Sequence, residues 1–374
     1  MRPQAQERNW TELVLTGGPS AGKSSSLAYL AQHFADHGVR VLIRPEVATM
    51  IIQGGVSDIS RLAREEPGRY LEAERAVLMI GWEMRSHYRR LAEAFAPQPV
   101  LIVYDRAEMD VAAYLEPQQF RALLDEHMLT LAAARDSYDV VVHLRSAAVG
   151  APEHYTTENN PARQERDPAV AAEADERTLR AWLGHPRLWI VESEEDFDRK
   201  RAKVARIAHH ALGLPAPTEI ERKFLLAGAP DLSHPVLAGA VEVEIEQHYL
   251  TAEEEGVERR VRRRAQDGQE TFYWTEKRGQ GLEREAIIKP SEYLHLLAER
   301  DPARRPIRKR RYCFAFAGHH FELDRIERPG EPLWLLEVEL LESGQELVLP
   351  DFLEIEREVT GDPAYSSAAL AASA

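Results

Sequence analysis

The sequence contains a single cysteine, Cys313, among its 374 residues. One thiol excludes an internal disulfide, and a cysteine-based zinc site needs several thiolates. Long apolar runs are also missing. None approaches the roughly 18 residues of a membrane span, so we expect no span. The opening segment, MRPQAQERNW, lacks the apolar stretch of a signal peptide. These absences lead us to expect a soluble chain in the reducing cytoplasm.

Lysine is scarce, because only seven of the 47 basic residues are lysines, and the formal net charge is −15. An acidic chain is a poor partner for nucleic acids, so we expect no nucleic-acid binding. The length and the 44% hydrophobic content predict two or more globular domains, each with its own core.

The two halves of the chain differ in pattern. In the first, helical segments separate five short apolar runs, at residues 13–16, 39–43, 99–104, 140–144 and 189–191. This alternation predicts an α/β domain with a parallel sheet and helices on both faces. Beyond the prolines at 215 and 217, strand-like segments dominate and predict an antiparallel sheet or barrel. We therefore predict a first domain over residues 1–213, a linker over 214–217 and a second domain over 218–374.

Residues 17–24 read GGPSAGKS and fit the phosphate-loop pattern G-x-x-x-x-G-K-[ST]. A predicted strand precedes the motif and a predicted helix follows it, which is the context that the motif requires. Its glycines let backbone amides approach phosphate oxygens at a helix N-terminus. Lys23 would reach the β- and γ-phosphates, and Ser24 would ligate magnesium. The predicted nucleotide contacts are Gly17, Gly18, Gly22, Lys23, Ser24 and Ser25.

Two carboxylates follow predicted strands, at the sheet edge where open α/β sheets bind ligands. Glu46 would accept a proton from a substrate hydroxyl, and Asp105, next to Arg106, would hold magnesium through water or act as a base. Capping of a helix is the alternative for either carboxylate. An arginine-rich segment further on would form a lid, in which Arg163 or Arg166 stabilises a transferring phosphoryl group. A solvated charged loop is the alternative there.

This half resembles the P-loop domain of the NadR type, a ribosylnicotinamide-kinase-like group, and the N-terminal domain of the TRPL translocation defect family. The resemblance rests on GGPSAGKS, RPEVATMI, DRAEMD and residues 159–186, and it covers roughly residues 10–210. It implies binding of ATP or GTP, with kinase-like geometry around Glu46, Asp105 and Arg106.

Charged residues alternate along the strands predicted in the second half. Residues two apart share a strand face. The sets that do so are Glu219, Glu221 and Lys223; Arg260, Arg262 and Arg264; and the pairs Glu283/Glu285, Lys309/Arg311, Glu322/Asp324 and Glu337/Glu339. A solvent-exposed face would explain most of them, but the segment WLLEVELL has the flanks of a buried strand. Carboxylates and bases on one face suit a magnesium or manganese ion with a triphosphate.

The segment EIERK resembles the E-x-E-x-K signature of the CYTH domain, also called the triphosphate tunnel metalloenzymes. That group includes class IV adenylate cyclases, thiamine triphosphatases and inorganic triphosphatases. Further likenesses are QHYL, RVR, TEK, KRRY, LD, EVEL and REVTGDPAY, and together they cover about residues 218–370. The resemblance implies an α+β domain with an eight-stranded antiparallel tunnel. The order of P-loop domain and then CYTH domain is similar to that of the TRPL translocation defect family.

The resemblance also implies roles for the charged residues. The implied metal-binding acids are Glu219, Glu221, Glu337 and Glu339, and Glu283, Glu285 and Asp324 are further candidate metal ligands. The implied triphosphate-binding bases are Lys223, Arg260, Arg262, Lys277, Lys309 and Arg311. Two questions of parity stay open: which member of Glu283/Glu285 faces inward, and which residues of the basic run 308–311 do so.

These patterns predict an enzyme with two phosphate sites. Its P-loop domain binds ATP or GTP with Mg²⁺, and its tunnel binds and hydrolyses an inorganic or organic triphosphate with Mg²⁺ or Mn²⁺. One alternative is a GTP-binding regulatory protein whose tunnel binds a phospholipid head group without turnover. Another is a nucleoside or small-molecule kinase with the CYTH domain as a sensor of a phosphorylated small molecule.

Overall fold

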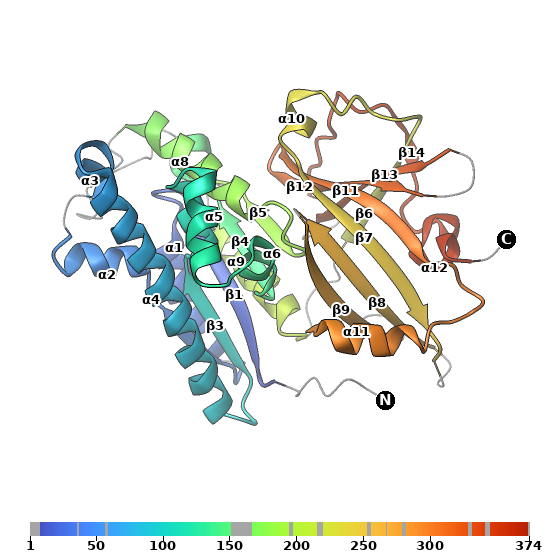
Figure 1. Ribbon diagram of the computed structural model, residues 1–374, viewed down its shortest axis with the longest axis horizontal. Coiled ribbons are helices and arrows are strands. Elements are labelled where there is room, and N and C mark those ends of the chain that lie inside the picture. Colours follow the sequence, from blue (N-terminus) through green and yellow to red (C-terminus); the bar gives the residue numbers. More distant parts are fainter. Residues whose placement is uncertain are drawn as a thin grey trace. The chain divides into compact units, whose positions relative to one another are not determined.

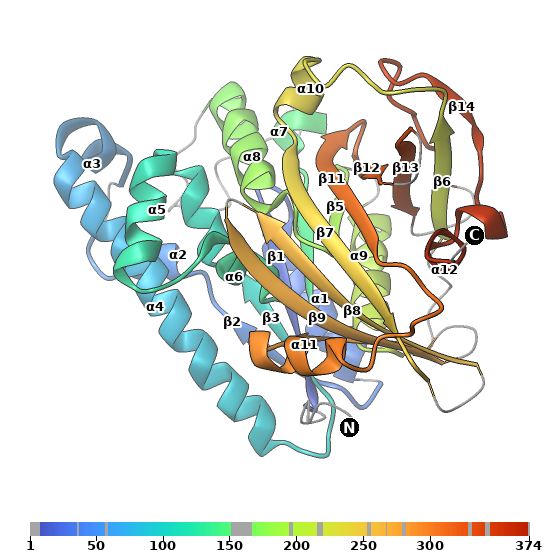
Figure 2. The same ribbon diagram turned by 45° about the vertical axis from the view of Figure 1, so that its right-hand side comes forward.

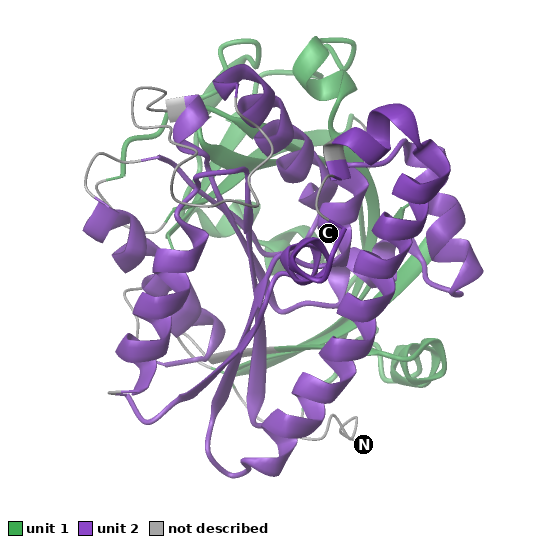
Figure 3. Cartoon of the chain, turned by 90° about the vertical axis from the view of Figure 1, so that its left-hand side faces the viewer, with its two compact units in different colours: residues 1–6, 217–374 green, residues 7–216 purple. Residues whose placement is uncertain are grey.

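A computed structural model describes residues 8–35, 37–56, 59–150, 167–193, 197–214, 220–252, 256–266, 268–278, 282–327, 331–340 and 345–372. The chain forms two compact units, Glu7–Ala216 and Pro217–Ala374, which Figure 3 colours separately. Among the helices in these ranges, none combines the length and the apolar character needed to cross a bilayer.

The first unit is built on a sheet of five strands in the order β2-β3-β1-β4-β5, and every neighbouring pair is parallel. The strands are β1 (Trp10–Gly17), β2 (Arg40–Arg44), β3 (Val100–Asp105), β4 (Val140–Leu144) and β5 (Leu188–Val191). Helices lie on both faces of the sheet (Figure 3), which explains why β3 and β4 are buried almost throughout. The predicted α/β class is confirmed, and each of the five predicted apolar runs forms a strand.

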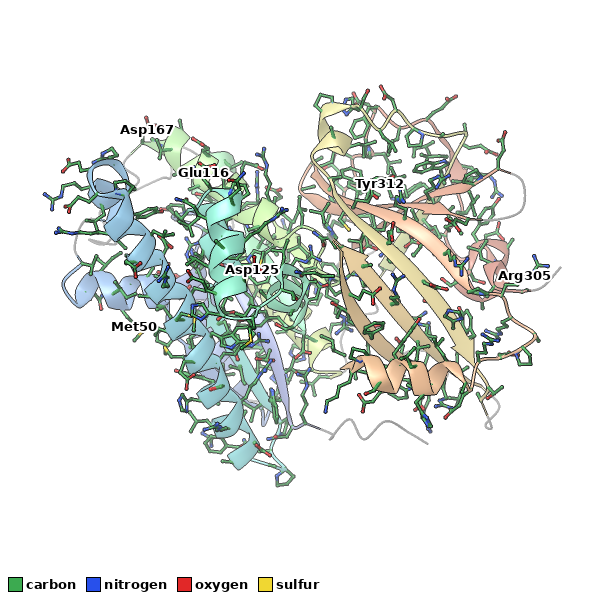
Figure 4. All side chains as sticks on the ribbon, viewed as in Figure 1. Met50, Glu116, Asp125, Asp167, Arg305 and Tyr312 are labelled. Carbon is green, nitrogen blue, oxygen red and sulfur yellow. The ribbon has the colours of Figure 1, made fainter. Side chains whose placement is uncertain are left out.

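The helical elements of this unit are α1 (Lys23–Ala35), α2 (Val47–Gln53), α3 (Ile59–Glu65), α4 (Pro67–Ala94), η1 (Glu108–Ala113), α5 (Pro117–Glu126), α6 (Leu131–Asp136), α7 (Ala147–Gly150), α8 (Pro168–Trp182) and α9 (Phe197–Ala211). Asp167, labelled in Figure 4, caps α8, because its side chain accepts a hydrogen bond from the amide of Ala169 at 2.8 Å. Figure 1 shows the long α4 crossing the unit, and α4 contacts β1, β2 and β3.

A buried carboxylate joins α4 to the centre of the sheet. Glu12 on β1 has no exposed surface, and it accepts hydrogen bonds from Arg85 Nε at 2.9 Å, Arg89 Nη2 at 2.6 Å and Tyr104 Oη at 2.7 Å. Burial alone would raise the pKa of Glu12, but the two arginines lower it to about 2. The carboxylate is therefore ionised at neutral pH, and it compensates the buried charge of Arg85.

We expect Glu12→Gln to lower the free energy of unfolding of this unit by about 3–5 kcal/mol, because it leaves the buried guanidinium of Arg85 without its counter-charge. Urea unfolding at pH 7 measures the change, with the exposed Glu93→Gln on α4 as the control. The pKa of Glu12 is lowered in the folded state. The difference between wild type and variant should therefore be complete above about pH 4.5 and shrink as the pH falls toward about 2. A change below about 0.5 kcal/mol at pH 7 would contradict this assignment.

The second unit contains one antiparallel sheet with the order β10-β9-β8-β7-β11-β12-β13-β6-β14. Its strands are β6 (Ile220–Leu226), β7 (Val241–Leu250), β8 (Val257–Gln266), β9 (Gln269–Arg278), β10 (Leu282–Ile288), β11 (Ile307–Phe316), β12 (His319–Ile326), β13 (Leu333–Leu340) and β14 (Ile355–Glu358). The predicted antiparallel architecture is confirmed. The described residues of this unit form nine strands rather than the expected eight, because the short β14 pairs with β6 across an irregular register.

Short helices accompany this sheet: α10 (Pro235–Ala238), α11 (Pro290–Leu297), η3 (Pro363–Tyr365) and α12 (Ser367–Leu370). The two faces of the sheet differ sharply in character. Tyr312 on β11 (Figure 4) belongs to a buried apolar cluster with Phe224, Phe321 and Leu336 from β6, β12 and β13. A second apolar cluster packs β8 and β9 against α11. Both apolar clusters lie on the same face of the sheet, which we call the outer face.

The opposite face, which carries Lys223, Arg262, Lys309, Arg311 and Glu337, is called the inner face. At one end it encloses a buried cluster that includes Leu225 on β6 and Tyr249 on β7. Three strands, β11, β12 and β13, separate β6 from β7 in the sheet order. The sheet must therefore curl for these side chains to meet, and Figure 2 shows this curvature. Charged side chains along the rest of the inner face consequently face one another.

Candidate functional site

The predicted phosphate loop joins the end of β1 at Gly17 to the start of α1 at Lys23. Lys23 Nζ donates hydrogen bonds to the carbonyl oxygens of Gly17 and Gly18, both at 3.1 Å. Ser24 and Ser25 are exposed in the first turn of α1. The loop thus brings all the predicted nucleotide contacts, Gly22 included, to one helix N-terminus, where amides and the helix dipole favour an anion.

Close packing explains two of the loop glycines. A Cβ on Gly18 would lie 2.7 Å from Cβ of Asp175, and the amide of Gly18 donates to Asp175 Oδ1 at 2.8 Å. Gly22 has a φ of +85°, and a Cβ there would lie 2.4 Å from the ring of Phe197. Any larger residue would therefore displace α8 or α9 from the loop.

Three of the predicted catalytic residues meet at the carboxyl edge of the sheet. Glu46 follows β2, Asp105 ends β3, and Arg106 Nε lies 2.7 Å from Glu46 Oε1. Glu46 occupies the N-cap position of α2 without making a side-chain capping bond, and it accepts instead from Thr49 Oγ1 at 2.7 Å. Asp105 Oδ1 is buried without a hydrogen-bond partner in the described structure. Neither carboxylate therefore serves as a helix cap.

Electrostatic coupling ties these groups to the phosphate loop. Burial lowers the pKa of Lys23, and the nearby Arg106 lowers it further. Burial raises the pKa of Asp105, and Glu46 adds to the rise while Lys23 opposes it. Burial also acts to raise the pKa of Glu46, but Arg106 and Lys23 outweigh it and leave the pKa below its usual value. Glu46 is thus held as an anion, and the unpartnered oxygen of Asp105 suits a magnesium-bound water.

Two further carboxylates, which were not predicted from the sequence, form hydrogen bonds with residues at the carboxyl edge of the sheet. Asp110 on η1 bonds the Thr16 hydroxyl and the Ala107 amide, the latter at 2.8 Å, and lies 3.2 Å from Arg106 Nη1. Asp175 on α8 accepts from the amides of Gly18 and Ser146 at 2.8 and 3.0 Å. For Asp110, its position four residues after Arg106 is the sequence feature that could predict its ion pair with that arginine. Nothing local in the sequence marks the second.

Some predicted residues lie outside the described residues. They are Arg163 and Arg166 of the predicted lid, Glu219 of the EIERK segment, and the side chain of Glu283. The backbone of Glu283 is described, and its register places it opposite Lys277 on β9.

In the second unit, Arg311 on β11 is the centre of a network on the inner face. Its guanidinium donates to both carboxylate oxygens of Asp324 at 2.7 Å, to Glu337 Oε2 at 2.8 Å, and to Glu322. Lys309 also bonds Asp324, and Lys223 Nζ lies 2.8 Å from Glu337 Oε1. Four strands thus contribute to one cluster, and Glu322 belongs to it although it is not among the site residues predicted from the sequence.

Strands β8, β9 and β10 extend the same face. Arg262 Nη2 lies 3.3 Å from Glu285 Oε2, which also accepts from Thr275 Oγ1 at 3.0 Å. Arg260 lies directly opposite Thr275, so it shares this face. Lys277 lies two residues further along β9 and is exposed.

The register settles the parity of the basic run at 308–311. Arg308 contacts Glu246 at 3.2 Å, and Arg310 contacts Glu242 and Glu244 at 3.1 and 3.2 Å. These exposed pairs lie on the outer face. Lys309 and Arg311 therefore point to the inner face, because alternate residues of a strand point to opposite sides.

Like charges crowd the inner face at two places. Glu221 lies directly opposite Glu339 in the pairing of β6 with β13, an arrangement that is unfavourable between carboxylates. Burial and Glu337 raise the pKa of Glu221. Burial lowers the pKa of Arg262, with Arg260, Arg264 and Arg311 adding to the effect and Glu285 opposing it. A divalent cation near the acids and a polyanion near the arginines would relieve both strains, and the oxygen donors fit Mg²⁺ or Mn²⁺.

The fold and the loop define a protein with a nucleotide-binding, P-loop-like α/β domain and a separate antiparallel sheet with a charged inner face. Residues 12–200 match the AAA domain family. The inorganic triphosphatase of Nitrosomonas europaea is 36% identical over 163 aligned residues, and the match covers 42% of this chain and 98% of the relative. The chain therefore belongs to the AAA domain family and, over the matching residues, to the family of this triphosphatase.

Two solved structures are also similar to parts of this chain. One is the crystal structure of an inorganic triphosphatase, whose sequence is 33% identical. The match has a TM-score of 0.32 and covers 42% of this chain and 97% of the triphosphatase chain. The other is the structure of a deoxyadenosine kinase from M. mycoides with bound dATP, whose sequence is 12% identical. The match has a TM-score of 0.36 and covers 52% of this chain and 96% of the kinase chain.

Proposed function

We propose that the chain is a two-domain phosphohydrolase whose second domain, residues 218–374, binds and hydrolyses a triphosphate with a divalent metal ion. The observation that carries the proposal is the inner face, which carries both crowded arginines and directly opposed carboxylates. The likeness to an inorganic triphosphatase supports it, and we assign that likeness to this domain. The CYTH resemblance of EIERK supports the same assignment.

In this proposal the residues divide by charge. Arg260, Arg262 and Arg311, with Lys223, Lys277 and Lys309, hold the phosphate oxygens. The metal is held by Glu221, Glu337 and Glu339, together with Glu219, Glu283, Glu285 and Asp324. When bound, Mg²⁺ or Mn²⁺ would supply polarisation of the terminal phosphoryl group. Ion pairs already hold Arg262, Arg311 and Glu337 in place before substrate arrives, so these three side chains need little reorganisation.

A substrate panel tests the proposal. Tripolyphosphate, thiamine triphosphate, ATP and GTP are each incubated with the full chain and Mg²⁺ or Mn²⁺, and phosphate release is followed with and without EDTA. We expect metal-dependent release from at least one of these triphosphates. Tight binding of a triphosphate or a phospholipid head group without release would overturn the hydrolase and favour a regulatory binding protein.

The first domain, which we propose spans residues 1–213, binds ATP or GTP with Mg²⁺ through Lys23 and Ser24. The Lys23 ammonium is the charged group that the loop places among its carbonyl oxygens. We expect Lys23→Met to weaken binding of ATP or GTP by roughly 10- to 100-fold, the loss of one charge-assisted contact to phosphate.

Isothermal titration of the full chain with ATP and with GTP measures the loss. The matched control is Lys289→Met, which removes an exposed lysine in the other unit. The P-loop assignment fails if Lys23→Met binds both nucleotides as tightly as this control.

A second candidate function for the first domain is phosphate transfer to a hydroxyl acceptor, with the other domain sensing a phosphorylated small molecule. The observation that favours it is the position of Glu46, held as an anion beside Arg106 and electrostatically coupled to Lys23. A carboxylate so placed suits a general base for an acceptor hydroxyl.

A further inference from the structure

Three histidines gather at the far ends of two packed helices in the first unit. His33 lies in the last turn of α1, His209 lies in the last turn of α9, and His37 follows α1 by two residues. One ring nitrogen from each lies within 4.8 Å of the other two. These histidines take no part in the phosphate loop or its carboxylates, so another explanation is needed for their convergence.

The hydrogen bonds prepare the rings to bind a metal. His37 Nδ1 lies 2.8 Å from the carbonyl oxygen of His33, and a carbonyl only accepts, so Nδ1 carries the proton. His37 Nε2 therefore keeps its lone pair. A backbone carbonyl that fixes the tautomer in this way is the usual outer support of a metal-binding histidine.

The other two rings face each other, with His33 Nε2 and His209 Nε2 2.8 Å apart. Two neutral imidazoles share a proton at that distance. Around a tetrahedral zinc ion the two nitrogens would stand roughly 3.3 Å apart, so the ion replaces this bond after a shift of about half an ångström. Nδ1 of His209 is buried without a hydrogen-bond partner in the described structure, so this ring can shift without breaking a second bond.

The local electrostatics suit a cation as well. Both α1 and α9 end at this cluster, so the negative ends of two helix dipoles point toward it.

From this geometry we infer that His33, His37 and His209 form a binding site for a first-row transition metal ion, of which Zn²⁺ is the representative. Three imidazoles match the preference of zinc, whereas Mg²⁺ requires oxygen ligands. The bound ion would tie the C-terminus of α1 to α9. Because α1 starts at Lys23 and α9 packs Phe197 against Gly22, the clip would brace the two helices that flank the phosphate loop.

The test uses the full chain, stripped with EDTA and then kept in excess Mg²⁺ so that carboxylate sites are filled. Zn²⁺ is titrated by calorimetry, and Co²⁺ is titrated by visible absorption, because its spectrum reports nitrogen ligation. We expect one Zn²⁺ per chain at this site and a rise in Tm of about 5 °C at saturation. His37→Gln and His209→Gln should each weaken this binding by at least 10- to 100-fold, while His87→Gln on α4, an exposed histidine, should leave it unchanged.

His37 is exposed, so its replacement should not disturb folding, and the Tm of each variant in EDTA checks this. Equal Zn²⁺ affinity and stoichiometry in wild type, His37→Gln and His209→Gln would overturn the inference. So would a wild-type chain that shows neither Zn²⁺ binding in excess Mg²⁺ nor a shift of Tm, in which case the three rings form a hydrogen-bonded cluster alone.

Discussion

Replacing Glu337 by glutamine is expected to slow phosphate release from the triphosphate that we propose binds the inner face, by on the order of 10²–10³-fold. Glu337 contacts Arg311 and Lys223, both at 2.8 Å, and lies opposite Glu322 in the strand register. Burial alone would raise its pKa, but Lys309, Arg311 and Lys223 hold the pKa below its usual value. In the proposed site, the variant removes an anion that positions two phosphate-binding cations and that would offer an oxygen to the metal.

The control for this experiment is Glu244→Gln, which removes a carboxylate from the outer face of the same sheet, where Glu244 pairs with the exposed Arg310. Initial rates with Mg²⁺ and with Mn²⁺ should be unchanged in the control. If Glu337→Gln and Glu244→Gln retain the same rate, the inner face is not the site of hydrolysis.

We also expect a large effect of Glu46→Gln on phosphate transfer by the first domain. If the first domain transfers phosphate to a hydroxyl, this change should lower the rate by on the order of 10²–10⁴-fold, the contribution of a general base. Nucleotide affinity should fall much less, because the neutral amide keeps its size beside Arg106. Glutamine removes only the charge that Arg106 and Thr49 now hold in place.

Transfer from γ-labelled ATP to a panel of nucleosides and small alcohols measures this rate. Glu93→Gln on the exposed side of α4 serves as the control. Transfer that survives Glu46→Gln at the control rate would exclude Glu46 as the base. If wild type shows no transfer to any acceptor, the first domain would be a nucleotide-binding domain without kinase activity.

Local motifs explain why much of the first unit was predictable. The phosphate loop combines glycines, a lysine and a serine within eight residues, and the flanking strand and helix follow from short apolar patterns. Its supporting carboxylates act from far away in sequence. Asp110 bonds Thr16 across 94 positions, and Asp175 bonds Gly18 across 157. No local pattern encodes such pairings, because they depend on how the helices pack over the sheet.

In the second unit, too, contacts between distant segments decide what the sequence alone does not predict. Period-two alternation predicts which residues share a strand face, but not which face is inside. For residues 308–311, the neighbouring strands β7 and β12 decide which side chains point inward. Arg308 and Arg310 pair with acids of β7 on the outer face, and Lys309 and Arg311 point to the inner face. The expectation of eight strands does not include the short β14, whose four residues pair with an irregular register. Alternation places Glu322 on the same face as Asp324, but its hydrogen bond with Arg311 from another strand is not predictable from the sequence.

The central claim is that the inner face of the second unit is where a triphosphate and its metal ions bind. A crystal structure of the full chain, grown with Mn²⁺ and a non-hydrolysable tripolyphosphate analogue, tests this most directly through the anomalous signal of manganese. We expect manganese beside Glu221, Glu337 and Glu339, and phosphate density against Arg262 and Arg311. Analogue bound only at the phosphate loop of the first unit, with no manganese on the inner face, would contradict the account.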